Sequence, residues 1–180
     1  MKTENIVQYV LRLTVTLLVI TGVVAAALAG VNAITKDAIA ANQEKKTQDA
    51  LAVVLPNAHS LQQLPLEGDA GIVQAVYAAE GSYAVKVAPA GFDGAVTMMV
   101  GISDGAITGI SVISHTETPG LGAVAAAQNA KGEAFRGQFV GQSGTLAVGD
   151  QIDAMSGATI TSNAVVTGVN AALSYVANLG

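Results

Sequence analysis

The longest apolar run of the chain lies near its N-terminus. The 23 residues Leu13–Thr35, between Arg12 and Lys36, include no charged side chain. As an α-helix rising about 1.5 Å per residue, this run is roughly 34 Å long, and the hydrocarbon core of a bilayer is about 30 Å thick. The pattern predicts a single membrane-spanning helix over residues 13–35, preceded by a short N-terminus at residues 1–12.

The flanking residues indicate how this run is oriented. Lys2, Arg12 and the α-amino group precede it, a basic bias that favours a cytoplasmic N-terminus, although three lysines soon follow the run. Ala27-Leu28-Ala29 is typical of a signal-peptide cleavage site, so a cleaved secretion signal is the alternative. The run continues past that tripeptide, which favours an anchor. Both interpretations place the rest of the chain outside the cytoplasm.

Beyond the run the apolar positions become amphipathic. They recur at helical spacing from Lys36 to Leu55, and Pro56 ends the pattern. This predicts a connecting helix over residues 36–56 and an exported domain over residues 57–180. The first stretch of that domain, Asn57–Gly71, mixes Pro, Gly and polar residues and predicts a loop.

The domain then shows strand patterns. Four runs of β-branched and apolar residues predict strands, namely Ile72–Tyr77, Tyr83–Val87, Ala95–Ile102 and Ile107–Ile113. Asp104-Gly105, between the last two, is typical of a tight hairpin turn because glycine tolerates positive φ. A short helix over Ala123–Ala130, a strand over Thr145–Val148 and a closing helix over Ser162–Leu179 complete the pattern. We predict an α+β fold, with one transmembrane helix followed by a twisted antiparallel sheet and packed helices.

Composition argues against several classes of function. From Ala50 onward three basic residues stand against nine acidic ones, so the domain has no basic stripe for nucleic acid. The chain has no cysteine, which excludes disulfides, thiolate metal sites and iron–sulfur ligation. His59 and His115 lie far apart in sequence, and we interpret each as a surface or locally bonded histidine. No metal site is predicted.

The segment Asp153–Asn163 concentrates small and hydroxyl-bearing residues just before the closing helix. Gly157 and Ala158 leave the backbone accessible, and Thr159 offers a hydroxyl. The first N–H groups of a helix have no internal partner and lie at the positive end of the helix dipole, so they can bind a phosphate. An ordinary helix N-cap explains the same residues, and on these features alone it is the favoured interpretation.

A family resemblance changes that balance. Ser156-Gly157-Ala158-Thr159, preceded by Asp153, resembles the flavinylation motif of FMN-binding domains. Such domains occur in the G subunit of the Rnf ion-translocating complex and in the C subunit of the sodium-translocating NADH:quinone reductase. The segment from Gly91 to Gly122 and the stretch Phe135–Phe139 are also similar to this family, and the short chain resembles the Rnf G subunit. The resemblance implies FMN joined to Thr159 by a phosphoester, which a separate flavin transferase forms from FAD.

The resemblance also implies the remaining site residues. A loop with a tight Pro-Gly-x-Gly path lies against the flavin. For Ser156 and Thr161, phosphate contact and a plain loop or capping role are both open, and for Asp153 the alternatives are ordering of the loop through backbone N–H groups and an ordinary loop position. No residue is assigned a catalytic role. The implied cofactor-binding residues are Thr159, Ser156, Gly157, Ala158, Thr161, Glu117, Thr118, Gly120, Leu121 and Gly122.

The implied function is electron transfer in an Rnf-type ferredoxin:NAD oxidoreductase, as one subunit rather than a complete enzyme. The implied partners are the other membrane and peripheral subunits, the flavin transferase and membrane lipid. The span has no charged residue to mark an ion path, and the chain has no cysteine cluster for ferredoxin chemistry and no G-x-G-x-x-G motif for NAD. The alternatives are an anchored flavoprotein of a quinone reductase or of extracellular electron transfer, and a non-redox binding module.

Overall fold

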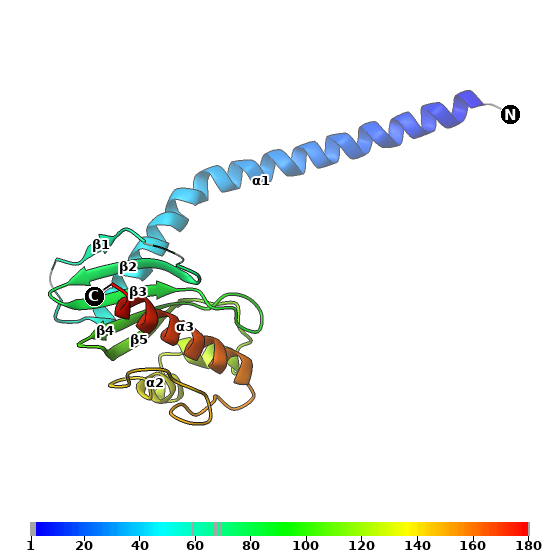
Figure 1. Cartoon of the computed structure of the whole chain (residues 1–180). Coiled ribbons are helices and arrows are strands. Elements are labelled where there is room, and N and C mark those ends of the chain that lie inside the picture. Colours follow the sequence, from blue (N-terminus) through cyan, green and yellow to red (C-terminus); the bar gives the residue numbers. More distant parts are fainter. Residues whose placement is uncertain (1–2, 59, 67, 69, 180) are drawn as a thin grey trace. The chain divides into compact units, whose positions relative to one another are not determined.

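A computed structural model of the chain describes residues 3–58, 60–66, 68 and 70–179, and side chains from Ile6 onward within these ranges (Figure 1). The interpretation of His59 lies outside the described residues. The chain divides into two compact units, Met1–Lys45 and Lys46–Gly180. Each unit is described by itself.

One long helix forms the described part of the first unit. Helix α1, Thr3–Val54, has 52 residues, so the predicted span and connecting helix are parts of one helix. Within the first unit its apolar side chains are exposed, for example Leu18 at 67% and Val24 at 52%, whereas Leu51 and Val54 at its end are buried in the second unit. An 18-residue window of this helix has a mean hydropathy of 2.3, so α1 is long and apolar enough to cross a membrane.

A five-stranded antiparallel sheet organises the second unit (Figure 1). Each strand pairs with the next along the chain, so the order in the sheet is the order in sequence. The α+β prediction is confirmed. The strands are β1 Gln62–Leu64, β2 Val73–Ala79, β3 Ser82–Val87, β4 Thr97–Ser103 and β5 Ala106–Ser114.

Sequence patterns located four of these strands to within two residues. The predicted hairpin turn is also confirmed, because Ser103 pairs with Ala106 and the residues between them, Asp104 and Gly105, have φ of 52° and 76°. Strand β1 was not predicted. It is a three-residue edge strand of mostly exposed, polar residues, held by backbone pairing with β2, and it has no apolar alternation to signal it.

The two faces of the sheet are both buried, as strand β4 illustrates. Met98 belongs to a large core shared with α3, Thr159–Ala177, whereas the next residue, Met99, packs with the end of α1. On that second face the hydroxyl of Thr108 donates a hydrogen bond to the carbonyl of Val54, at 2.6 Å. Alternating side chains of one strand therefore serve two different layers.

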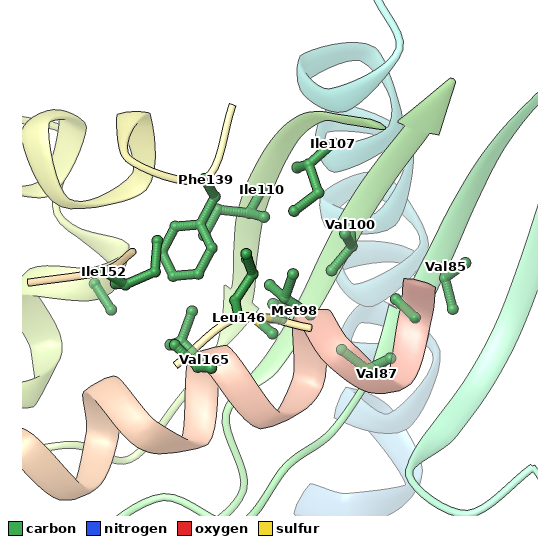
Figure 2. Close-up of a cluster of buried hydrophobic side chains, with 14 of the residues drawn as sticks. Val85, Val87, Met98, Val100, Ile107, Ile110, Phe139, Leu146, Ile152 and Val165 are labelled. Atoms are coloured by element: carbon green, nitrogen blue, oxygen red, sulfur yellow. The ribbon is translucent and has the colours of Figure 1, made fainter. Parts of the chain in front are cut away.

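Figure 2 shows part of the larger core, in which side chains of β3, β4 and β5 belong to one cluster with Val165 of α3. Phe139 and Ile152 enter the same core from the segment that follows α2, Ala130–Gly137. Phe139 is fully buried, and its ring meets that of Phe135 edge-on with centroids 5.6 Å apart. The chain between the sheet and α3 is thus anchored by its own apolar residues.

The helix predicted over Ala123–Ala130 was misplaced. Its first half is a 3₁₀ helix, η1, Gly122–Ala126, and the α-helix α2 begins only at Ala130. Asn129 sets this boundary, because its side chain accepts hydrogen bonds from the amides of Lys131 and Gly132 and so caps a new helix.

The strand predicted over Thr145–Val148 was wrong. The segment makes a single isolated bridge, from Val148 to Ile152. The amide and carbonyl of Leu146 are instead bonded by the side chain of Asn170 on α3, each at 2.9 Å. Because a side chain satisfies these backbone groups, they are not available to a strand ladder.

Candidate functional site

A pocket of about 340 Å³ lies where the glycine-rich elbow Gly91–Gly94 after β3, the loop after β5 and the start of α3 meet. Its size is within the range of small-molecule sites. The lining includes eight of the ten residues predicted from sequence, together with two apolar residues. The residues are Phe92, Glu117, Thr118, Leu121, Gly122, Gly157, Ala158, Thr159, Ile160 and Thr161.

The other two predicted residues lie on an adjoining groove of about 700 Å³. Gly120 and Ser156 line this groove, and Leu121 lines both spaces. A Cβ built on Gly157 would lie 3.1 Å from Cδ2 of Leu121. The Leu121 side chain therefore packs closely on the motif loop, Asp153–Ala158, which precedes α3. The structure therefore separates Ser156 from the pocket that Thr159 lines.

Helix α3 begins three residues earlier than the pattern predicted. Thr159 is its first residue, and its N-cap, Ala158, has φ −135° and no side chain able to cap the helix. Thr161 and Ser162, whose hydroxyl groups could cap a helix that began later, lie inside the first turn instead. Among the described residues no side chain caps this helix start, so its first amides have no side-chain oxygen as a partner.

Glu117 connects all three segments around the pocket. Its Oε1 accepts hydrogen bonds from the amides of Phe92, at 2.8 Å, and Asp93, at 3.3 Å. Its Oε2 accepts one from the hydroxyl of Thr161, at 2.5 Å. Glu117 is only 5% exposed, although a carboxylate in a loop would ordinarily be solvated. The carboxylate thus fixes the elbow and the start of α3 to the loop between them.

The surroundings keep Glu117 ionised. Burial raises the pKa of its carboxyl group, but hydrogen bonds from Thr161 and from the amides of Asp93 and Phe92 outweigh burial. His115 adds a smaller electrostatic effect in the same direction as these bonds. The net result is a pKa below the ordinary value of about 4.5.

Two glycines make room for this carboxylate. A Cβ on Gly91 would overlap Oε1 of Glu117, and a Cβ on Gly122 would overlap Oε2 and the Thr161 hydroxyl. Gly120 differs, because its φ is +78° but open space surrounds its Cβ position. The glycines of the loop therefore serve two purposes, close approach at Gly122 and a left-handed backbone at Gly120.

The motif loop before α3 is held at both ends. Gln138 accepts a hydrogen bond from the amide of Asp153, at 2.7 Å, and donates one to the carbonyl of the same residue, at 3.4 Å. At the other end the Ser162 hydroxyl accepts from the amide of Met155 and donates to the carbonyl of Ala158, both at 2.9 Å. Ordering of this loop by the Asp153 carboxylate was one of two alternatives from the sequence, and the hydrogen bonds described here come from Gln138 and Ser162.

Sequence reasoning missed two residues of the pocket, Phe92 and Ile160. They are 67% and 55% exposed, and each lies beside a residue or motif that was singled out, in the Gly91–Gly94 elbow and directly after Thr159. Large apolar side chains next to glycine-rich, solvent-facing loops were the available signal. His115 is half-buried and does not line the pocket, and its Nδ1 has no hydrogen-bond partner among the described residues.

Comparisons with known proteins identify relatives over nearly the whole chain. Residues 91–174 match the FMN-binding domain family, and residues 1–54 match the RnfG N-terminal region. The chain is 34% identical to the G subunit of the Na(+)-translocating ferredoxin:NAD(+) oxidoreductase complex of Acetobacterium woodii, over 99% of both chains. It is 33% identical to the G subunit of the ion-translocating oxidoreductase complex of Methanosarcina acetivorans, over 92% of this chain and 93% of that one. A proton-translocating counterpart from Clostridium ljungdahlii is 41% identical over 53% of each chain.

Proposed function

Since the chain belongs to the family of G subunits of ion-translocating oxidoreductase complexes, we propose that it transfers electrons through FMN bonded covalently to Thr159. The family includes an FMN-binding domain, and this domain matches the half of the chain that contains the pocket. The phosphoester to Thr159 and the roles of the individual residues are the parts of this proposal that need a test.

The observation that carries the proposal is the position of Thr159. Its side chain is exposed, it lines the pocket, and it is the first residue of a helix that no side chain caps within the described part of the chain. A phosphate on this hydroxyl would lie at the positive end of the helix dipole, beside amides that need acceptors. Gly157 and Ala158 leave the approach to the hydroxyl unobstructed by large side chains.

The pocket walls also suit the ring of a flavin. Phe92, Leu121 and Ile160 line the pocket and remain 67%, 43% and 55% exposed, so apolar surface is available to cover a planar aromatic group. When bound, FMN would supply the redox chemistry of this site. The protein residues fix its position, exclude water from part of its surface and hold the phosphate.

The N-terminal helix supports a membrane location. Relatives that match residues 1–54 are subunits of ion-translocating complexes, and the apolar part of α1 is wholly unburied in this chain. We therefore assign residues 1–12 to the cytoplasm, 13–35 to the membrane, 36–56 to a connecting helix and 57–180 to an FMN domain on the extracytoplasmic side. Membrane lipid surrounds the span in this arrangement.

The partners follow from the same family. The relatives are named as subunits of complexes, so the proposed partners are the other membrane and peripheral subunits of an Rnf-type ferredoxin:NAD oxidoreductase. A flavin transferase is the remaining proposed partner. The pocket side of Thr159 bears no neighbouring histidine or lysine among its lining residues, so an external enzyme is the simplest source of the phosphoester.

Replacing Thr159 tests the covalent link. The full chain is expressed with an active flavin transferase, denatured, and examined for in-gel flavin fluorescence and for a flavin-modified peptide by mass spectrometry. We expect Thr159→Ala to lose the label and Thr167→Ala, an exposed threonine on the same helix, to retain it. Flavin bonded to another residue in the Thr159→Ala protein would refute the assignment.

Single cysteines test the orientation, because the natural chain has none. A membrane-impermeant maleimide should label Ser143→Cys, exposed in the domain, on intact cells. Gln8→Cys, before the span, should be labelled only after the membrane is opened. The reverse pattern would place the domain in the cytoplasm.

A further inference from the structure

Glu117 is exceptional among the buried residues of the second unit. In the described ranges, four polar residues are buried, Thr47, Glu117, Thr161 and Ser162, and Glu117 alone of these carries a formal charge. Burying an ionised carboxylate is costly unless specific partners compensate. A charge retained at such a position acts electrostatically on any group bound beside it.

The partners of this charge are neutral. Two backbone amides and one hydroxyl bond the carboxylate oxygens. The one titratable neighbour with an effect on Glu117 is His115, and its effect is the smallest of the five. Dipoles therefore stabilise the negative charge without cancelling it, in contrast to an ion pair with lysine or arginine.

The charge is also fixed in place at the wall of the pocket. Gly91 and Gly122 pack so closely on the two carboxylate oxygens that a methyl group at either position would overlap them. Thr161, which bonds Oε2, lies two residues after Thr159 on α3, and Glu117 and Thr159 line the same pocket. A group attached at Thr159 and lying in this pocket is therefore close to an immobile, unneutralised carboxylate.

We propose that Glu117 is a redox-tuning residue, whose buried negative charge lowers the reduction potential of the flavin held in this pocket. The inference rests on the proposed function, since it requires FMN at Thr159. An electron added near a fixed negative charge is repelled, and the repulsion is stronger in a partly desolvated pocket than in water. The flavin is thereby kept a better electron donor than the same flavin beside a neutral wall.

Glu117→Gln is the direct test, because it removes the charge and keeps the shape. The amide oxygen still accepts from the Phe92 and Asp93 amides, and the amide nitrogen can donate to the Thr161 hydroxyl. At about pH 8, we expect potentiometric titration of the flavinylated full-length protein to give a more positive potential. We expect the equilibrium constant between oxidised and reduced flavin to change about tenfold in favour of the reduced form, which corresponds to about 59 mV for a one-electron couple. Asp93→Asn, the same chemical change at an exposed neighbour, should shift the potential far less.

A second variant separates charge from structural disturbance. Thr161→Val keeps the charge and removes a dipole that offsets it, so the potential should become more negative. A positive shift in Thr161→Val would overturn the proposal, and so would an unchanged one. If Glu117→Gln does not fold, the potential of Thr161→Val is the test of the proposal.

The two proposals fail in different ways. Potentials are measured only on protein whose flavin on Thr159 has been identified by mass spectrometry. Wild-type protein without that flavin refutes the proposed function. Wild-type protein with the flavin, and a Glu117→Gln potential equal to that of wild type or more negative, refutes the tuning role alone.

Discussion

The two units of this chain place the same residue types in opposite environments. In the first unit Leu18 and Val24 are 67% and 52% exposed, whereas in the second Phe139 and Val169 are fully buried. The part of α1 in the first unit satisfies its backbone hydrogen bonds internally, but it has no other described element to cover its side chains. The domain buries its apolar residues by itself, while this part of α1 needs an apolar surrounding.

Glycine shows the same contrast. Gly22 and Gly30 of α1 have open space where a Cβ would lie, but Gly122 in the domain would meet Glu117 and Thr161. A side chain added to the helix therefore contacts only what surrounds the protein. In the domain an added side chain must displace the protein itself.

The largest expected effect comes from the domain core. Phe139→Ala should lower the free energy of unfolding of the second unit by about 3–5 kcal/mol, because a fully buried ring leaves a cavity. Denaturant unfolding of the full chain in detergent measures this. Leu18→Ala in α1 is the matched control and should leave the same transition within about 0.5 kcal/mol. Equal losses for the two variants would contradict the comparison.

The next effect concerns the environment of α1. Val24→Arg places a charge near the centre of the uncharged run and should disfavour membrane insertion by about 2.5–3.5 kcal/mol. We expect more protein in the supernatant after alkaline carbonate washing of membranes. Ala41→Arg, beyond the run, should stay in the pellet. If both variants remain equally in the pellet, α1 is not held by its apolar run.

A glycine pair gives a smaller effect. Gly122→Ala should destabilise the second unit by about 1–3 kcal/mol, since the methyl group forces Glu117 or Thr161 to move. Gly30→Ala should leave that unit unchanged. Chemical denaturation compares them, and flavin absorbance reports whether the pocket has changed. An unchanged free energy of unfolding for Gly122→Ala would show that the Glu117 carboxylate is not tightly enclosed.

The smallest effect is a pH dependence. Because the folded-state pKa of Glu117 lies below its ordinary value of about 4.5, ionised Glu117 stabilises the fold above that pH. The contribution disappears as the pH falls through the folded-state pKa. Unfolding curves between about pH 6 and pH 3 should therefore show a steeper loss for wild type than for Glu117→Gln. Asp37→Asn, at an exposed acid of α1, should lose stability with falling pH as steeply as wild type does.

Local patterns determined much of this protein. The uncharged run predicts α1, the period-two runs predict four strands, and Asp104-Gly105 predicts the turn that joins β4 to β5. Each of these depends on neighbours within a few residues in sequence, because periodicity and turn geometry are local properties. The motif at residues 156–159 is a local pattern of the same kind, and three of its four residues line the pocket.

The tertiary structure decided what no local pattern contains. The side chain of Asn170 hydrogen-bonds the amide and carbonyl of Leu146, so these groups do not pair in a strand. Strand β1 forms by backbone pairing with the edge of β2. Glu117 appears in sequence as a loop carboxylate. It becomes a buried charge because amides 24 and 25 residues earlier and a hydroxyl 44 residues later meet at its two oxygens. Such partners are brought together by packing of distant segments, so only the folded chain reveals them.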